Sequence, residues 1–243
     1  MSLVRFHPSR LGLIMTDAKA IDPALLVGEY LEISKKKVKT DEDKAILEPL
    51  WDMTLSQGAK TELKSIAKEE IFGYRKNISS RYLDKGLMCE DACIELRNLV
   101  LFDDLKKNTE RRSNEWLTGE LDLIKPSEKR IIDIKCAWDM DTFPAFAEDV
   151  ADKNYEYQGR AYLMLWDMEV FELCYCLVDT PEELIKWDQP ELHRVSHIPP
   201  EHRISRIEYR RDLAIEEKIK RKCDAAQKYV LTLFEQFEKE HSL

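Results

Sequence analysis

One segment constrains the fold more than any other, WLTGELDLIKPSEKRIIDIKCAW at positions 116–138. Two runs of mostly apolar and β-branched residues flank a polar stretch that contains proline and serine, a composition typical of two strands joined by a tight turn. We predict the first strand at Gly119–Ile124, the turn at Lys125–Lys129 and the second strand at Arg130–Cys136. The chain should therefore build a sheet around a β-hairpin.

Two charged residues interrupt the apolar interior of the second strand. Asp133 and Lys135 are two positions apart, so both side chains leave the strand on the same face. Asp122, on the neighbouring strand, can meet them. A buried acid is costly unless it is paired or binds a cation. The three residues therefore predict a site for a hard divalent metal, with the backbone carbonyl of Ile134 as an additional ligand.

An acid two residues before a lysine is uninformative by itself, since this spacing occurs six times in the chain. Five examples lie in polar, helix-like or loop-like surroundings, where a solvated charge pair is the ordinary interpretation. Only Asp133–Lys135 lies in a β-branched run with a second acid on a preceding strand. The other five examples are Asp17–Lys19, Glu42–Lys44, Glu62–Lys64, Asp104–Lys106 and Glu216–Lys218.

The same arrangement suits the hydrolysis of a phosphodiester bond. Carboxylates that hold Mg²⁺, with Mn²⁺ as a substitute, neutralise charge on the phosphate and help to make a water nucleophilic. A lysine beside the metal can orient or deprotonate that water and stabilise the developing charge. The alternative is a purely structural ion pair between Asp133 and Lys135.

The order of these residues resembles the PD-(D/E)XK nuclease superfamily, whose motif is an acid, a hairpin and an acid–x–lysine triplet. Leu121–Asp122 corresponds to the first half, with leucine where the motif has proline, and Asp133–Ile134–Lys135 corresponds to the second. The resemblance implies that Asp122 and Asp133 bind metal and that Lys135 is catalytic. It also implies an α/β fold with a central mixed sheet flanked by helices, the restriction-endonuclease-like core.

The upstream segment YLDKGLMCEDACIELRNLVLF, at positions 82–102, adds a further acid. Gly86 predicts a turn, and residues 90–102 have the apolar spacing of a helix. The pattern Lys85–Gly86–x–x–x–Glu90 resembles the lambda-exonuclease-like (YqaJ-type) phage recombination nucleases, which implies that Glu90 is a metal ligand. Glu95 is the rival in the same helix, and a solvated helix residue is its ordinary interpretation.

The downstream segment YEYQGRAYLMLW, at positions 155–166, predicts a helix in which Gln158 and Tyr162 share a face. This Gln-x-x-x-Tyr element resembles the one in RecB-like and lambda-type nucleases. The resemblance implies that Gln158 supports the metal-bound water or the substrate, and that Tyr162 lies near DNA. The alternative is an ordinary packed helix with Gln158 as a surface amide.

Two further residues are candidates for DNA contact. The opening segment RFHPSRLGLIMT, at positions 5–16, resembles the short first motif of phage exonucleases, which implies that Ser9 contacts a DNA 5′-phosphate. Ser9 is also a candidate cap for a helix that starts at Arg10, and the two roles are compatible because a helix N-terminus attracts anions. Trp138, in the loop after the second strand, is placed to gate the site or contact DNA.

Composition limits the remaining possibilities. The six cysteines lie in apolar contexts and predict reduced core residues rather than a zinc or iron–sulfur site. His193, His197 and His202 predict a surface loop. No apolar run approaches a membrane span and no signal peptide opens the chain, so we expect a cytoplasmic protein, bacterial or phage-encoded, without a membrane partner.

The net charge of −9 does not by itself indicate a nucleic-acid partner. Local basic runs do exist: positions 194–222 carry nine Lys and Arg against five Asp and Glu, and positions 35–39 contain four lysines. Such runs usually form a solvated face, but grouped around a channel they could follow a phosphate backbone.

We expect one nuclease domain over residues 1–243. Its core should span about 80–180, with a helical N-terminal extension at 1–79 and a basic segment and long helix at 181–243. The elements predicted outside the hairpin are helices at Thr40–Trp51, with Thr40 as cap, and Gln57–Tyr74, a strand at Val170–Val178, a helix capped by Thr180, and a long amphipathic helix at about Ile207–Phe237.

Together the motifs predict a Mg²⁺-dependent DNA exonuclease of the phage recombination type, acting at duplex ends. The resemblance implies a single-strand annealing protein as partner and a homo-oligomer as a possible assembly. Two alternatives keep different parts of this prediction. One is a structure-specific or nicking endonuclease or a resolvase with the same site, and the other is a catalytically silent module that binds DNA or a protein partner.

Overall fold

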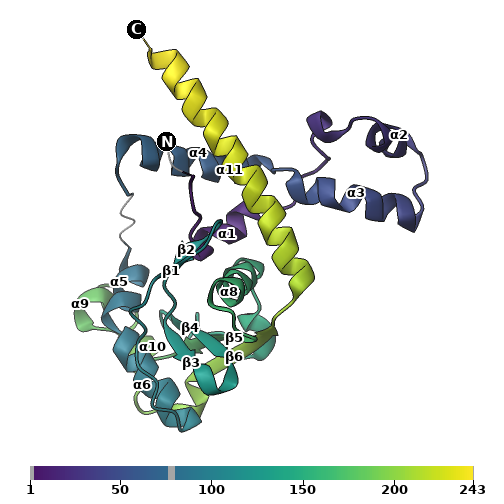
Figure 1. The fold of residues 1–243 in the computed structure, drawn as a ribbon. Helices are drawn as coiled ribbons and strands as arrows, with labels where there is room; N and C mark the ends of the chain where they lie inside the picture. The colour runs from purple at the N-terminus through teal and green to yellow at the C-terminus, as the bar shows by residue number, and fades with distance from the viewer. Residues whose placement is uncertain (1–2, 76–79, 243) are drawn as a thin grey trace. The chain divides into compact units, whose positions relative to one another are not determined.

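The computed structural model describes residues 3–75 and 80–242 (Figure 1). The chain divides into two compact units. The helical unit comprises Met1–Lys76, Ser113–Thr118 and Asp212–Leu243, and the sheet unit comprises Asn77–Arg112 and Gly119–Arg211. The organisation as one nuclease domain stays a prediction.

The sheet unit is built on four strands in the order β3-β4-β5-β6. The strands are β3 (Leu123–Lys125), β4 (Arg130–Cys136), β5 (Val170–Cys176) and β6 (Ile204–Arg210). The central pair, β4 and β5, is parallel, whereas β3 and β6 run antiparallel to their neighbours. The predicted α/β class with a mixed sheet is therefore confirmed.

Helices cover both faces of this sheet (Figure 1). On one face, α6 (Glu90–Leu101) packs Cys93 and Ile94 against Ile134 and Cys174. On the other face, α8 (Lys153–Trp166) lies over β5. The remaining elements of the sheet unit are α5 (Arg81–Met88), α7 (Ala147–Val150), α9 (Glu182–Ile185), α10 (Pro190–His193), η2 (Pro126–Glu128) and η3 (Pro200–His202).

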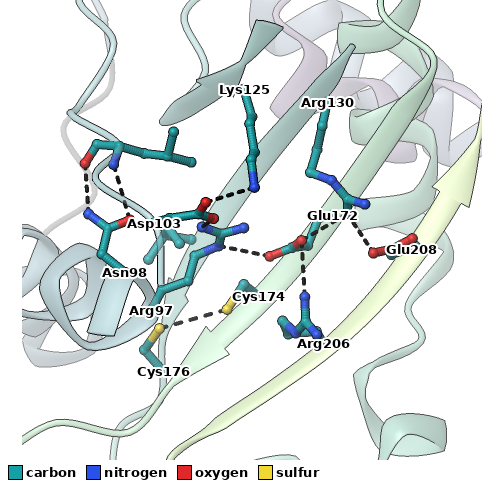
Figure 2. Close-up of polar contacts among 12 residues, drawn as sticks. Arg97, Asn98, Asp103, Lys125, Arg130, Glu172, Cys174, Cys176, Arg206 and Glu208 are labelled. Atoms are coloured by element: carbon teal, nitrogen blue, oxygen red, sulfur yellow. Dashed lines mark hydrogen bonds and ion pairs between the residues drawn. The ribbon is translucent and has the colours of Figure 1, made fainter. Parts of the chain in front are cut away.

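A network of ion pairs ties the α6 face of the sheet together (Figure 2). Its centre is Glu172 on β5, which is fully buried. Glu172 accepts hydrogen bonds from Arg97 Nε on α6 at 2.8 Å and from Arg130 Nη1 on β4 at 2.9 Å, and Arg206 on β6 adds a third contact at 3.3 Å. Because every charge in it has a partner, the network can lie in the core.

The helical unit contains α1 (Pro8–Ile14), η1 (Pro23–Leu25), α2 (Glu29–Lys35), α3 (Asp41–Met53), α4 (Gln57–Phe72) and α11 (Leu213–His241). The predicted capping box of α3 is confirmed, since the Thr40 side chain accepts from Asp43 N and the Asp43 side chain accepts from Thr40 N. The long C-terminal helix packs on α3 and α4 through a buried stripe that includes Ile219, Cys223 and Val230. The short strands β1 (Arg112–Ser113) and β2 (Thr118–Gly119) form a separate two-stranded sheet.

Several predicted boundaries are wrong. The C-terminal helix begins at Leu213 rather than Ile207, because residues 204–210 pair with β5 as the edge strand β6. The first hairpin strand does not run unbroken from Gly119, since residues 120–122 leave the ladder before β3. Gly86 lies inside α5, and the break before the next helix falls at Cys89.

Three local predictions are also corrected. Ser9 does not cap α1, because the helix begins at Pro8 and Ser9 is its second residue. Thr180 does not cap α9, since its hydroxyl group donates to the Trp138 carbonyl and forms a hydrogen bond with His193 Nδ1. His193 is fully buried rather than in a surface loop.

No helix in the described part of the chain is both long and apolar enough to cross a membrane.

Candidate active site

Strand β4 places Asp133 and Lys135 on the same face of the sheet, as the alternation of side chains requires. The Lys135 ammonium group lies 2.5 Å from Asp133 Oδ2 and 4.7 Å from the centre of the Tyr155 ring. Asp133 is only 5% exposed. The strand therefore holds a carboxylate and an ammonium group side by side, with the carboxylate largely shielded from water.

Asp122 joins this pair from the segment just before β3. Its Oδ2 accepts a hydrogen bond from the backbone N–H of Ile134 at 2.7 Å. The ladder between β3 and β4 ends at the pair Leu123–Ile132, so the Ile134 amide lacks a backbone partner on that side. The carboxylate takes that place, which fixes the Asp122 side chain close to Asp133.

Helix α8 contributes Gln158 and Tyr162 one turn apart. Gln158 is 7% exposed, and its Nε2 donates to Asp133 Oδ1 at 2.8 Å. The Tyr162 hydroxyl group donates to the Glu120 carbonyl. Gln158 is therefore not a surface amide, since its contact fixes the orientation of Asp133.

Glu90 is the first residue of α6, the helix that covers the other face of the sheet from α8. It forms an ion pair with Lys107 and lines the same cavity of about 700 Å³ as Asp122, Asp133 and Lys135. Glu95 is exposed, in agreement with its expected place on the helix surface.

The electrostatics of the cavity are dominated by the two aspartates. Burial, together with the negative charge of Asp133, raises the pKa of Asp122 to about 7. Burial alone would lower the pKa of Lys135, but the adjacent negative charge of Asp133 outweighs burial, so the pKa of Lys135 is raised. Burial and the two aspartates also raise the pKa of Tyr162. A cation would relieve the repulsion between the aspartates.

The donor set fits a hard divalent cation in its chemistry. Asp122, Asp133 and Glu90 all offer carboxylate oxygens to one cavity, and Mg²⁺ prefers oxygen ligands. The three carboxylates do not form a compact group, however, since no cluster of three or more His, Cys, Asp or Glu suited to a metal occurs within residues 3–75 and 80–242. Instead, Glu90 forms an ion pair with Lys107, and Asp133 forms one with Lys135.

The predicted DNA-contacting residues are more dispersed. Tyr162 lines the cavity, but Trp138 is buried outside it, with its indole N–H donating to Asp188 Oδ2 at 3.2 Å. Ser9 is exposed in the helical unit. Its role at a DNA end stays a prediction.

The sequence did not point to two residues that contact the site. Tyr155 faces Lys135, and its spacing from Gln158 and Tyr162 by three and seven positions is a helical-face signal that could have found it. Lys107 pairs with Glu90 across 17 residues of chain, and no local pattern marks it.

No protein-family model matches the sequence, and no curated protein matches it. A solved phage-related exonuclease from Haemophilus somnus 129PT superposes with a TM-score of 0.80 at 30% identity, covering 97% of each chain. The alkaline exonuclease LHK-Exo from Laribacter hongkongensis gives a TM-score of 0.64 at 10% identity, over 97% of this chain and 92% of its own. LHK-Exo in complex with dAMP gives 0.58 at 12% identity, over 78% and 88%.

The two Laribacter structures show that the fold is shared. The match to the Haemophilus protein shows the family as well as the fold, since it extends over nearly the whole of both chains at 30% identity. The resemblance drawn from the motifs is thereby confirmed. This chain is a nuclease, and it belongs to the family of phage-related exonucleases.

Proposed function

We propose that this protein is a Mg²⁺-dependent exonuclease that hydrolyses phosphodiester bonds at the ends of duplex DNA, in recombination of the phage type. One observation carries the proposal: Glu90, Asp122, Asp133 and Lys135 line a single cavity, with Gln158 bound to Asp133. The dAMP in one LHK-Exo structure is a deoxynucleotide, which supports DNA as the substrate.

Asp122 and Asp133 would hold Mg²⁺, or Mn²⁺ in its place, together with Glu90 and the backbone carbonyl of Ile134. When bound, the ion supplies positive charge to the phosphate and acidifies a water. Asp122 enters the cavity with a pKa near neutrality, so it gives up a proton readily when a cation is close.

Lys135 carries its proton, because Asp133 raises its pKa. Its role is therefore to orient the attacking water and to stabilise negative charge on the phosphate, rather than to accept a proton. Gln158 acts through Asp133, whose carboxylate it keeps in one orientation.

The remaining parts of the proposal concern partners. Tyr162, Ser9 and Trp138 are proposed to contact DNA, Trp138 only after a rearrangement that uncovers its ring. A single-strand annealing protein would receive the single strand that digestion leaves, and a homo-oligomer is the proposed assembly.

Linear duplex DNA labelled at one 5′ end, incubated with Mg²⁺ or with EDTA beside a covalently closed circle, tests the activity. We expect loss of the linear DNA only with Mg²⁺, and an intact circle. Early release of the label as a mononucleotide sets the direction. Cutting of the circle would instead identify an endonuclease with the same site.

Asp133→Ala supplies the matched control for the site. It removes a metal ligand and the partner of both Lys135 and Gln158. We expect no cleavage above background with this variant. Full Mg²⁺-dependent activity of Asp133→Ala would show that the assignment of the site is wrong.

A further inference from the structure

The rim segment, residues 107–111, lies at the edge of the cavity of about 700 Å³ that Asp122 lines, the catalytic cavity. It is bonded to the part of the chain that carries this acid. Asn108 N donates to the Asp122 carbonyl at 2.7 Å, and Asn108 Nδ2 donates to the Leu121 carbonyl at 3.1 Å. Asn108 Nδ2 also donates to the Glu110 carbonyl at 2.9 Å, and Asn108 Oδ1 accepts from Glu110 N at 3.2 Å. These hydrogen bonds fix the backbone of the rim segment beside the cavity.

Two cations of the rim segment contact carboxylates that line the catalytic cavity. Lys107 forms an ion pair with Glu90, and Arg111 Nε donates to Glu120 Oε1 at 2.9 Å. Glu90 and Glu120 both belong to the lining. The side chains of Lys107 and Arg111 are 49% and 48% exposed, so a ligand that approaches the cavity from solvent can reach both.

The lining of the cavity is itself too acidic to attract a phosphate group. Five carboxylates and one ammonium group belong to it, which leaves four net negative charges when every group is ionised. A divalent cation cancels two of these charges, so the lining still repels a phosphate. Lys107 and Arg111 supply the two positive charges that balance the rest. The carboxylates are those of Asp84, Glu90, Glu120, Asp122 and Asp133, and the ammonium group is that of Lys135.

Lys107 and a divalent cation compete for the same carboxylate, because the ammonium group contacts Glu90 Oε2. A cation bound at Glu90 repels the ammonium group. The Lys107 side chain is flexible and half exposed, so it can turn away from Glu90, while the hydrogen bonds of Asn108 keep its backbone at the cavity. A phosphate of bound DNA then offers the negative charge that Lys107 has lost.

We propose that Lys107 and Arg111 bind phosphate groups of the DNA backbone at the edge of the catalytic cavity, and that Lys107 is released for this contact when a divalent cation binds Glu90. The inference rests on the proposed function, since it uses the same substrate and the same cation. It gives the rim segment the role of holding the DNA strand beside the carboxylates. Phosphate contacts position a nucleic acid without reading its sequence, so the role is the same for every DNA sequence.

Binding of Mn²⁺ to the protein without DNA tests the competition at Glu90, with electron paramagnetic resonance of free Mn²⁺ as the measurement. Lys107→Met removes the competing ammonium group, so we expect the affinity for Mn²⁺ to rise by about two- to fivefold. Lys129→Met is the matched control, because Lys129 is exposed and precedes the start of β4, whereas Lys135 lies near the end of that strand. It should bind Mn²⁺ as the wild type does. Equal affinities in all three proteins would overturn the competition.

The salt dependence of DNA binding tests the phosphate contacts. Fluorescence anisotropy of a labelled duplex oligonucleotide measures its affinity at several KCl concentrations, with Ca²⁺ as the cation and with gel electrophoresis to verify that the DNA stays intact. Each phosphate contact contributes about 0.9 to the slope of log affinity against log salt, so we expect Lys107→Met and Arg111→Met each to reduce the slope by about 0.9, and the double variant by about 1.8. In EDTA, Lys107 stays paired with Glu90, so Lys107→Met should have the slope of the wild type.

The outcomes separate this inference from the proposed function. An unchanged slope of Lys107→Met in Ca²⁺ would overturn the phosphate contact, and an equal reduction in EDTA would overturn the exchange with the cation. Lys107→Arg keeps the positive charge and should retain the slope of the wild type, as should Lys129→Met. A wild-type chain that neither binds nor cleaves DNA would contradict the proposed function, and this inference with it. Wild-type binding and cleavage with an unaltered Lys107→Met slope would contradict this inference alone.

Discussion

At the scale of single residues, Asp133 shows how a buried acid gains a defined geometry. One oxygen accepts from Gln158 and the other lies against Lys135, while Asp122 approaches with a second negative charge. The sequence placed Asp133 and Lys135 correctly, since both depend on strand periodicity alone. It could not show that Gln158 contacts Asp133, because their 25-residue separation is closed only by the packing of α8 on the sheet.

Gln158→Ala should lower kcat by roughly 10- to 100-fold, because Asp133 loses the hydrogen bond that orients it. The variant should remain folded, since the change removes only one amide. Steady-state kinetics on linear duplex DNA at several Mg²⁺ concentrations measure the effect. Gln236→Ala, on the exposed surface of α11, is the control, and equal rates in the two variants would contradict the role of Gln158.

Lys135→Met and Asp133→Asn should separate chemistry from metal binding. Lys135→Met leaves the carboxylates in place, so we expect calorimetry to show retained Mg²⁺ binding while activity falls by roughly 100- to 1,000-fold. Asp133→Asn removes a ligand charge, so both metal binding and activity should be lost. Loss of Mg²⁺ binding in Lys135→Met would indicate that the lysine is needed to build the site rather than for the reaction.

At the scale of elements, β5 combines an apolar sequence with one fully buried acid. The alternation of Glu172, Cys174 and Cys176 places all three on the α6 face, where Arg97 and Arg130 meet the carboxylate (Figure 2). A lone acid in the run VFELCYCLV is a signal for a buried partner. Its partners could not be predicted, because they lie on three other elements that only the sheet order brings together.

Glu172→Ala should destabilise the fold by about 3–5 kcal/mol, since it leaves buried arginines without their shared counter-ion. Urea unfolding followed by circular dichroism measures the free energy of unfolding. Glu208→Ala is the matched control, because Glu208 pairs with the same Arg130 but is 42% exposed. Glu208→Ala should lower the free energy of unfolding much less than Glu172→Ala does. Similar losses in the two variants would mean that the network contributes little to stability.

Gly159 defines how closely α8 approaches β5. A Cβ at this position would lie 2.0 Å from Phe171 Cδ1, which is closer than atoms can pack. Gly159→Ala should therefore force α8 away from the sheet and weaken the contact between Gln158 and Asp133. We expect a lower melting temperature together with reduced activity, and restoration of both in the double variant with Phe171→Leu. Unchanged stability of Gly159→Ala would contradict this close approach.

At the scale of the whole molecule, every residue of the cavity belongs to the sheet unit. A ligand that binds only the folded state stabilises the part that holds it. Saturating Mg²⁺ should therefore slow backbone amide hydrogen exchange in β4 and in α8. Exchange in α11, which belongs to the helical unit, should change little. Exchange measured by mass spectrometry with and without Mg²⁺ tests this. Equal protection along the chain would indicate that the cation does not act at the carboxylates.

The sequence by itself determined the parts of this protein that depend on local periodicity and capping. The turn-flanked apolar runs gave the hairpin, two-residue alternation put Asp133 and Lys135 on one face, and Thr40 with Asp43 marked the start of α3. Each of these features depends only on interactions within a few residues, so one short segment of the chain is enough to predict it.

Only the tertiary structure decided the rest. Residues 204–210 form a strand because β5 offers an unpaired edge, although the apolar spacing predicts that positions 207–210 begin the long helix. The Cys176 thiol meets the Cys93 carbonyl because α6 packs against β5, and Glu90 pairs with Lys107 from the loop that follows α6. These contacts join segments far apart in the chain, and their energies depend on burial and on a partner's charge, neither of which a local pattern contains.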